Sequence, residues 1–439
     1  MRMIMNKQVF LISFALLSSL YVGAESWSLD SCISYAVSHN LTVKARELNV
    51  VTGDLEITEA KDRFLPNLNA GAQQSFSFGR GLTSENTYAN RNTAQFGWSA
   101  QVSIPLFQGL RNVRNLEYSK AHFRQLVAEL ESAKDDISLS VIAQYLQVLY
   151  YQEMYKVSLE QLRISNVELQ RRQELLNAGK IPELDMLQTK SQVAQDELTS
   201  VTALNNQELA LLDLAQLLEL NTTQDFDILP LDETGEDISL LSAETVYESA
   251  LINNNSIQAS RLGVDVASKS IKLAQSGYLP TLAFSAGLGS SYYKTSGYNN
   301  EGFGNQMKHN LSQSLGFSLN IPIFDGFSTR NTIRRAKVQQ ISAELQLEET
   351  KLQLYKTITQ AHKQAVAAEK RLEASRVAEN TSGKALDAMR EKYNYGKANA
   401  TEFEQAKSNY MQAVSDAVQA KYETILRKRI LLFYYNSGQ

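Results

Sequence analysis

The feature that most constrains this chain is an internal duplication. Three short motifs occur twice, in the same order and separated by 214 to 217 residues: FLPNL at 64–68 and YLPTL at 278–282, SIPLFQG at 103–109 and NIPIFDG at 320–326, and NAGK at 177–180 and NYGK at 394–397. Four of the six prolines fall in these motifs: Pro66, Pro105, Pro280 and Pro322. A repeat of this length indicates one supersecondary unit that is used twice, with the prolines marking strand boundaries.

The motifs divide the chain into two halves. We expect a first repeat at residues 25–220 and a second at residues 240–434, followed by a short tail at 435–439. The stretch between them, 221–239, is acidic and broken in pattern, which is typical of a linker. Each half is expected to contain a helix, two strands and a helical hairpin.

The N-terminal segment resembles a secretory signal peptide. Arg2 and Lys7 precede the apolar run 9–22, and small residues follow before Glu25. The run is short for a bilayer-spanning helix, so cleavage after residues 1–24 is favoured over an uncleaved anchor. The single cysteine, Cys32, excludes an intramolecular disulfide and is expected to be a plain buried thiol.

Alternating residues predict strands between the proline motifs. In the first half, Phe96, Trp98 and Ala100 alternate with Ser99 and Gln101, which gives one apolar and one polar face. The copy and the segments after the Leu-Pro motifs behave similarly. We expect strands at about 68–79, 94–106, 281–290 and 312–323. The connections 79–93 and 290–310 are rich in Gly, Asn, Ser and Tyr, as long solvated loops should be.

The rest of the chain has a helical pattern. Residues 108–178 and 327–395 contain no proline and are dense in strong helix formers, with apolar residues at steps of three and four. A single helix from Arg114 to Ala178 would rise roughly 98 Å. The returning segments 183–220 and 241–276 would each rise roughly 55 Å. These lengths predict a rod with both strand pairs at one end and both Gly-Lys turns at the other.

The predicted strands are long enough to cross a bilayer when tilted. Trp98, Phe107 and Phe324 are expected near strand ends, where interfacial aromatic residues occur. Four strands cannot close into a barrel, and each unpaired backbone group in lipid costs several kcal/mol, so the sheet requires other copies of the chain. The alternative is a soluble layer of β-hairpins packed on helices.

The export signal and the duplicated motifs together resemble the TolC-type outer-membrane efflux proteins over essentially the whole mature chain. The resemblance implies a mainly α fold with transmembrane β: a homotrimer whose four strands per subunit build one 12-stranded barrel, and whose long antiparallel helical hairpins build a periplasmic α-barrel. It implies the outer membrane of a Gram-negative bacterium. It also implies a passive exit duct of a tripartite efflux or type I secretion system, with a periplasmic adaptor protein, an inner-membrane pump of the RND or ABC type and outer-membrane lipid as partners.

The same resemblance assigns the hairpin tips to the adaptor. The matching residues here are Gly179 and Lys180 in the first repeat, and Gly396 and Lys397 in the second. A glycine helix stop followed by a cation is also what any antiparallel helix pair uses, and the two interpretations are compatible.

The family narrows its tunnel near the tip with inward acidic residues. The matching positions, six residues past each glycine, are Asp185 and Glu402, and three residues further on Gln188 and Gln405 replace a second acidic residue. Rings of carboxylates around an axis favour cations and are candidates for a periplasmic gate. Solvated carboxylates on a helix surface remain the alternative interpretation.

Other functional classes lack sequence support. Lys and Arg total 43 against 47 Asp and Glu, a net charge of −4, so no basic excess favours nucleic acid. No H-E-x-x-H, G-x-S-x-G or P-loop motif is present, and four scattered histidines predict no metal site. We therefore expect no catalytic residues and no cofactor. A periplasmic coiled-coil scaffold or adaptor without a barrel is the second hypothesis, and a secreted enzyme is the third. The exported cargo is not encoded in any motif.

Overall fold

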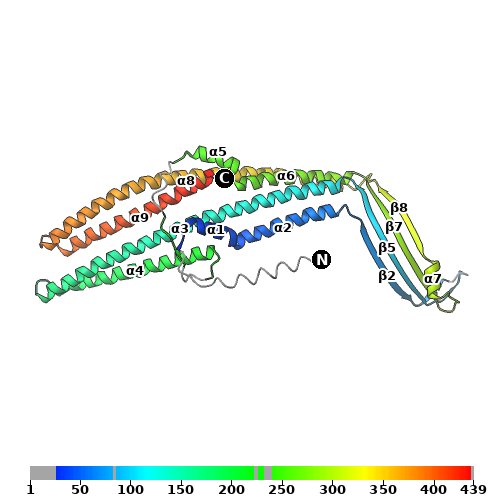
Figure 1. The fold of residues 1–439 in the computed structure, drawn as a ribbon, viewed down its shortest axis with the longest axis horizontal. Helices are drawn as coiled ribbons and strands as arrows, with labels where there is room; N and C mark the ends of the chain where they lie inside the picture. Colours follow the sequence, from blue (N-terminus) through cyan, green and yellow to red (C-terminus); the bar gives the residue numbers. More distant parts are fainter. Residues whose placement is uncertain (1–25, 83–85, 222–225, 232–239, 437–439) are drawn as a thin grey trace, which may run out of the picture. The chain divides into compact units, whose positions relative to one another are not determined.

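The computed structural model describes residues 26–82, 86–221, 226–231 and 240–436. Figure 1 labels its helices and strands. Their bounds, in chain order, are β1 Ser26–Trp27, α1 Leu29–His39, α2 Leu41–Asp62, β2 Asn67–Ser77, β3 Arg80–Leu82, β4 Tyr88–Asn90, β5 Thr93–Gln108, α3 Arg111–Asn177, α4 Glu183–Leu217, β6 Asp227–Ile228, α5 Ala243–Asn253, α6 Asn255–Gln275, the 3₁₀ turn η1 Ser276–Tyr278, β7 Thr281–Thr295, α7 Phe303–His309, β8 Ser312–Asn320, α8 Ser328–Asn394 and α9 Ala400–Asn436. The proposed signal peptide lies outside the described residues, as do parts of the linker and tail.

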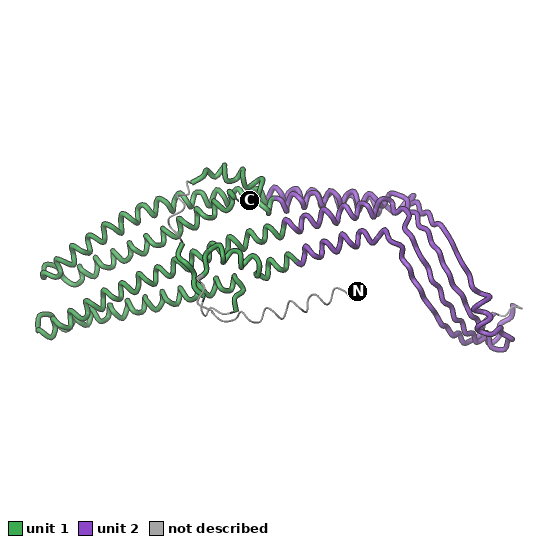
Figure 2. Tube along the Cα trace, viewed as in Figure 1, with its two compact units in different colours: residues 1–47, 129–257, 350–439 green, residues 48–128, 258–349 purple. Residues whose placement is uncertain are grey.

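The chain forms two compact units, and each unit takes segments from both sequence repeats (Figure 2). Unit 1 comprises residues 1–47, 129–257 and 350–439, and unit 2 comprises residues 48–128 and 258–349. Unit 1 holds α4, α9 and the larger parts of α3 and α8, from residues 129 and 350 onward. Unit 2 holds the sheet and the starts of α3 and α8. The predicted mainly helical fold with four long strands is confirmed.

The two repeats use the same local devices. The helices α3 and α8 each contain 67 residues, while α4 and α9 contain 35 and 37. Ser28 and Ser242 cap α1 and α5 by accepting the backbone N–H three residues on. Asn40 and Asn254 then interrupt the helical path, and each side chain accepts an N–H two residues further on. The second returning helix is therefore not continuous over 241–276 as predicted, because Asn254 adopts an extended backbone.

The core of unit 1 surrounds Tyr145 of α3. Its side chain is fully buried, and its hydroxyl donates hydrogen bonds to the carbonyl oxygens of Trp27 and Leu229. These carbonyls flank the parallel pairing of β1 with β6. Cys32 of α1 lies in the same core, and burial raises the pKa of its thiol to about 12. The prediction of a buried free thiol is confirmed.

The four long strands of unit 2 form an antiparallel sheet in the order β2-β5-β7-β8 (Figure 1). The register places Gln101 beside Asn69 and Gly287, and the next residue back, Ala100, beside Ala70 and Leu288. Most polar and most apolar residues therefore occupy opposite faces of the sheet, as their alternation predicts. The exceptions on the apolar face are Gln74, Ser290, Lys294 and Gln313. The outer edges of β2 and β8 have no strand partner among the described residues.

The polar face consists mainly of hydroxyl, amide and glycine residues, with Ala283 and Tyr293 also on it. None of the residues that the described strands place on it is charged. They include Gln73 and Ser75 of β2, Gln95, Ser99 and Gln101 of β5, Ser285 and Ser291 of β7, and Ser314 and Ser318 of β8. The opposite face exposes large apolar side chains, such as Phe76, Leu315 and Phe317, at 65%, 78% and 72% of their surface.

The connections between strands are more ordered than the loops we predicted. Between β2 and β5, the short strands β3 and β4 pair with each other. Strand β7 continues to Thr295, beyond the predicted end at 290, and α7 follows it. Residues 290–295 of β7 extend beyond the start of β8 at Ser312. There Gln306 accepts the backbone N–H of Tyr293 and donates to its carbonyl, and so takes the place of a neighbouring strand. A side-chain amide therefore satisfies backbone groups at the open edge of β7, a contact that hydrophobic periodicity cannot predict.

The passages from strand to helix also match between repeats. Gly109 and Leu110 both have positive φ before α3, and Gly326 and Phe327 do so before α8. A side chain at Gly109 would meet Leu279 and the carbonyl of Ser276 at about 3 Å. Two successive left-handed residues turn the chain sharply from sheet to helix. Among the described residues, we find no helix with the length and apolar character needed to span a bilayer.

Candidate functional site

The turn between α3 and α4 forms a Schellman motif. Gly179 has φ +67, and its N–H bonds to the carbonyl of Leu176 at 2.9 Å. The N–H of Lys180 reaches back to the carbonyl of Leu175, also at 2.9 Å. A Cβ at Gly179 would meet nothing within 4 Å, so the left-handed backbone alone favours glycine here.

The turn between α8 and α9 repeats this geometry. Gly396 has φ +68, and its N–H donates to the carbonyl of Tyr393 at 3.0 Å. The N–H of Lys397 donates to the carbonyl of Lys392 at 2.8 Å. Space around Gly396 is equally open. The predicted tips at 179 and 396 are therefore confirmed as turns, with both lysines exposed.

The two acidic gate candidates occupy the same position in their helices, the third residue. Glu402 forms a capping box with Asn399: its carboxylate accepts the Asn399 N–H, and its own N–H donates to the Asn399 side chain, both at 2.9 Å. Asp185 follows Pro182, which supplies no side-chain cap. Its carboxylate instead lies 3.9 Å from Arg172. Both carboxylates are thus engaged within the chain, by different partners.

A polar cluster joins the two hairpins next to the tips. Arg172 is 3% exposed and bonds to Glu168 at 3.1 Å, to the carbonyl of Asp185 at 3.3 Å, and to the hydroxyl of Tyr393. That hydroxyl donates to Glu168 at 2.8 Å. Burial, reinforced by Glu168, raises the pKa of Tyr393 to about 12. Since Tyr393 belongs to α8 and its partners to α3, the cluster fixes one tip beside the other.

A second cross-link is a buried ion pair further from the tips. Lys407 of α9 and Asp196 of α4 are 2% and 1% exposed, and lie 3.1 Å apart. Ser165 of α3 bonds to both, and Gln161 and Gln192 donate to the other carboxylate oxygen, each at 2.8 Å. A buried pair with every lone pair satisfied favours one alignment of the three helices.

Neither cross-link was predicted from the sequence, although the sequence around Lys407 indicates a buried charge. Lys407 lies four residues from Phe403 and from Met411, and both of those side chains are buried. A lysine at helical spacing within an apolar face indicates a buried charge that needs a partner. No comparable signal identifies the partner, because Asp196 lies on a separate helix.

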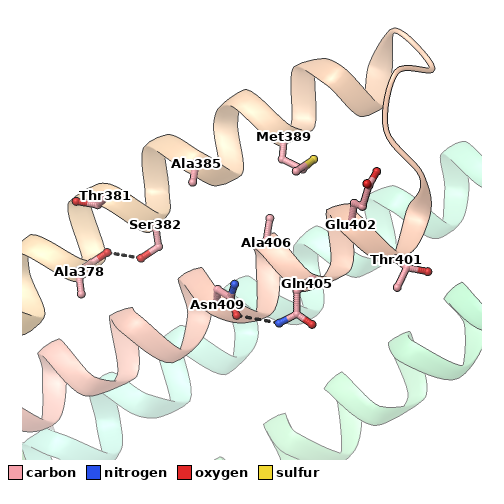
Figure 3. Close-up of a pocket in the computed structure, with 10 residues that line it drawn as sticks. All are labelled: Ala378, Thr381, Ser382, Ala385, Met389, Thr401, Glu402, Gln405, Ala406 and Asn409. Carbon is pink, nitrogen blue, oxygen red and sulfur yellow. Dashed lines mark hydrogen bonds between the residues drawn. The ribbon is translucent and has the colours of Figure 1, made fainter.

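A groove of about 810 Å³ separates α8 from α9 close to the second tip (Figure 3). Small side chains of α8 form one wall, and Glu402 and Gln405 belong to the other. Its residues are Ala378, Thr381, Ser382, Ala385, Met389, Thr401, Glu402, Gln405, Ala406 and Asn409. Neither this groove nor any other part of the chain that the structure describes has three His, Cys, Asp or Glu side chains arranged to hold a metal ion.

The strand prolines fall into two pairs. Pro66 and Pro280 stand directly before β2 and β7, as predicted. Pro322 follows β8, whereas Pro105 lies inside β5 at a register shift. Strand β2 pairs with β5 only as far as Ser103, so Pro105 interrupts no ladder on that side.

The three aromatic candidates also differ from one another. Phe107 lies at the end of β5, and Phe324 follows the end of β8. Trp98, however, is in the interior of β5, opposite Ala72 and Ser290, so its prediction near a strand end is wrong. Strand β5 begins at Thr93, five residues before Trp98.

Comparison with known proteins decides the family. The family model described as outer membrane efflux protein matches residues 32–219 and 246–431. The chain belongs to this family. It is 23% identical to the outer membrane protein TolC of Escherichia coli over 382 residues, which cover 85% of this chain and 75% of TolC. It is 21% identical to the alkaline protease secretion protein AprF of Pseudomonas aeruginosa, over 72% of this chain and 65% of AprF.

Solved structures of the family share the fold. The CmeC outer membrane channel of Campylobacter jejuni matches with a TM-score of 0.78 at 16% identity, covering 93% of this chain and 86% of that one. The family consists of channel proteins rather than enzymes. This chain is therefore an outer-membrane exit duct of a Gram-negative bacterium, and the predicted family, location and function are confirmed.

Proposed function

We propose that this protein is the trimeric exit duct of a tripartite efflux or type I secretion system. Three copies contribute four strands each to one 12-stranded barrel in outer-membrane lipid, and their helical hairpins form the periplasmic tunnel. Residues 1–24 act as a cleaved signal peptide. Residues 25–220 and 240–434 are the two repeats, residues 221–239 are the equatorial linker, and residues 435–439 are a tail.

The observation that carries the proposal is the open, two-faced sheet. Its apolar face exposes residues such as Phe76 and Phe317, and the outer edges of β2 and β8 remain without strand partners among the described residues. In hydrocarbon, each unpaired backbone group costs several kcal/mol. Pairing of β8 in one copy with β2 in the next removes both edges, which only a closed ring achieves.

Exposed stripes on two helices of unit 2 support the same arrangement. Leu48, Val51 and Leu55 of α2 are each more than half exposed, and they follow coiled-coil spacing. Val338, Ile341 and Leu345 of α8 do likewise. The helix α2 leads into β2, and α8 follows β8, so these stripes belong to the two elements that flank the open strand edges.

The tips are the proposed site of control. Gly179, Lys180, Gly396 and Lys397 contact a periplasmic adaptor, and Tyr395, 79% exposed beside Gly396, offers an additional aromatic contact. Asp185 and Glu402 form the acidic constriction. Cargo is driven in by an inner-membrane pump of the RND or ABC type, so the duct itself is passive. Trp98, Phe107 and Phe324 contact the lipid or its interface.

The test uses the two faces of β5. In planar bilayers, the purified protein should form channels, and light scattering in detergent should give three subunits per particle. Charging the apolar face (Phe96, Trp98 and Ala100 to Glu) should abolish insertion, whereas Ser99, Gln101 and Ser103 to Leu should leave insertion intact and alter conductance. Equal tolerance on both faces would contradict the barrel.

The competing hypothesis is a periplasmic scaffold without a barrel. A scaffold should extract from the envelope into buffer, whereas a duct requires detergent. Fractionation of cells that express the full chain distinguishes the two directly.

A further inference from the structure

The four helix ends that join the sheet lie side by side within unit 2 (purple in Figure 2). Strands β2 and β7 begin, and β5 and β8 end, at the same end of the antiparallel sheet. Asn112 of α3 donates to the carbonyl of Arg63, directly after α2, at 2.9 Å. Arg114 of α3 donates to the carbonyl of Lys272 of α6 at 2.7 Å. A Cβ at Gly277, just past α6, would meet a side chain in the first turn of α8 at 2.7 Å.

Each of these helix ends carries a cation in the turn next to the sheet. The four residues are Lys61 in the last turn of α2, Arg111 at the start of α3, Lys272 in the last turn of α6 and Arg330, the third residue of α8. All four side chains are exposed. None of them forms an ion pair with another residue that the structure describes. We call these four residues the basic collar.

The basic collar is a local excess of positive charge in a chain whose net charge is −4. The stretches that join helix to strand, 61–66, 106–115, 271–280 and 321–336, contain eight Lys or Arg and two Asp. One of the two, Asp325, is already engaged at the start of α8, where its carboxylate accepts the N–H of Thr329 at 2.8 Å. The positive charge at this end of the sheet is therefore not balanced within the junctions themselves.

Helix stability does not account for two of the four cations. The helix macrodipole favours a cation at the C-terminus of a helix and disfavours one at the N-terminus. Arg111 and Arg330 stand at the starts of α3 and α8, and neither first turn contains an acidic residue. The first turns of α1, α4, α5 and α9 all contain Asp or Glu instead. Arginine at the starts of α3 and α8 therefore points to an anion outside the chain.

The basic collar borders the apolar face of the sheet. Phe107, on that face near the end of β5, lies just before Arg111. Phe324 and Phe327 are 74% and 54% exposed and pack edge to face, with ring centroids 5.3 Å apart. The guanidinium of Arg330 lies over the Phe327 ring, 5.5 Å from its centroid. Exposed aromatic rings followed by a cation are typical of the boundary between hydrocarbon and lipid headgroups.

Resting on the proposed duct, we propose that the basic collar binds the phosphate groups of anionic phospholipids in the leaflet that faces the periplasm. In the duct, the helices leave the bilayer at this end of the sheet. Each collar cation lies within about one helical turn, or about 5.4 Å, of its helix end, which matches the depth of a headgroup layer. The collar repeats in every subunit, so anionic lipid surrounds the barrel and fixes its height in the bilayer.

Lipid competition tests the collar in the full-length oligomer. The purified protein in detergent is mixed with equimolar phosphatidylglycerol and phosphatidylcholine, and the lipid that it retains is quantified by mass spectrometry. Phosphatidylglycerol should be enriched several-fold, and the enrichment should fall in about 1 M salt, where the Debye length is about 3 Å. Equal retention of the two lipids would overturn the collar. A preference for lipopolysaccharide over phosphatidylglycerol would place the cations in the other leaflet and overturn it as well.

The test variant removes the four collar charges. It combines Lys61→Gln, Arg111→Gln, Lys272→Gln and Arg330→Gln, and it should lose the enrichment. The smaller variant Arg111→Gln/Arg330→Gln should lower the enrichment while circular dichroism shows unchanged helix content, because it removes charges that the two helix starts disfavour. Full enrichment in both variants would show that the collar does not hold the lipid.

A matched control makes the same change of charge in unit 1. It combines Lys190→Gln, Arg376→Gln, Lys384→Gln and Lys392→Gln, all at exposed positions. The control should retain the enrichment of phosphatidylglycerol. A loss equal to that of the test variant would mean that net charge, rather than the collar, selects the lipid.

Conductance distinguishes a lipid contact from a contact with passing ions. Cations that line the water-filled passage would make it less selective for anions when they are removed, and so would shift the reversal potential in a salt gradient. We expect the test variant to keep the native reversal potential, and a shift with unchanged lipid retention would overturn the proposal. If the native chain forms channels without enriching phosphatidylglycerol, only the collar fails. If it forms neither an oligomer nor a channel, the proposed duct itself fails.

Discussion

The two hairpin tips share their backbone turn and differ in the side chains that support it. Both turns stop a long helix with a glycine near φ +67 and the same pair of backbone hydrogen bonds. The next helix then begins with the Asn399–Glu402 box in the second tip, but with an uncapped Pro182 in the first. The duplicated geometry therefore depends on backbone conformation, whereas the engagement of each acidic residue is local to its own tip.

This difference changes how the two acidic residues should be interpreted. Glu402 contributes to holding its helix start, so its carboxylate has a structural role whether or not it also narrows a tunnel. Asp185 contacts the buried guanidinium of Arg172, which in turn contacts Tyr393 of the other hairpin. Asp185 is therefore linked through Arg172 to the other hairpin, whereas Glu402 bonds within its own turn.

The largest expected effect is on stability, and it comes from the buried Lys407–Asp196 pair that joins the two hairpins. Lys407→Met leaves the Asp196 carboxylate buried without its partner, which should cost about 3–5 kcal/mol of stability. Loss of helical circular dichroism on heating measures the change. Lys407→Met combined with Asp196→Leu should recover most of it. An unaffected single variant would show that the hairpins do not depend on this pair.

The two glycines should respond alike, because their φ values and open surroundings match. Gly179→Val or Gly396→Val forces a β-branched residue into left-handed backbone, at about 1–3 kcal/mol. Each should abolish export while the amount of protein in the outer membrane stays unchanged. Cell growth under a toxic substrate, with membrane immunoblots as the control, measures both. Normal export would remove the tips from the mechanism.

The helix starts should respond differently. Asn399→Ala removes a cap that accepts an N–H and should cost about 1 kcal/mol. Pro182→Ala, the matched change in the first tip, removes no side-chain bond and should cost far less. Hydrogen exchange at the first turns of α9 and α4 compares them. Similar losses would mean that the capping box does not distinguish the tips.

Neutralising the acidic pair tests the gate. Asp185→Asn with Glu402→Gln should raise single-channel conductance in planar bilayers, since less charge remains to hold the constriction. Glutamine still serves in a capping box, so the second change leaves the helix start intact. Single variants show which tip dominates. Unchanged conductance would exclude both residues from the gate.

The smallest effect is the titration of Tyr393. Because its pKa is raised to about 12 in the folded protein, the neutral phenol is favoured there. The stabilisation by the neutral Tyr393 phenol is complete below about pH 10, the pKa of tyrosine in the unfolded chain. It is lost as the pH rises through the folded-state pKa of about 12. The absorbance difference at alkaline pH between the native chain and Tyr393→Phe isolates this group among the 20 tyrosines. Ionisation near pH 10 would place it outside the cluster.

Much of the architecture follows from sequence pattern, because periodicity and proline motifs are local. The strands β2 and β5 and the turns at Gly179 and Gly396 lie within two residues of their predicted positions. The helix α7 was not predicted, since it depends on the amides that bond to the edge of β7. The Lys407–Asp196 pair was missed because helix packing, rather than spacing along the chain, brings the two residues together.

The uncharged polar face of the sheet has a consequence for anything that travels along it. Hydroxyls, amides and glycine offer weak, interchangeable hydrogen bonds and no fixed ion to trap or repel a passenger. In a duct lined by this face, an anion, a cation or a neutral molecule keeps its own water shell. Passage there is then governed by size and mobility rather than by affinity.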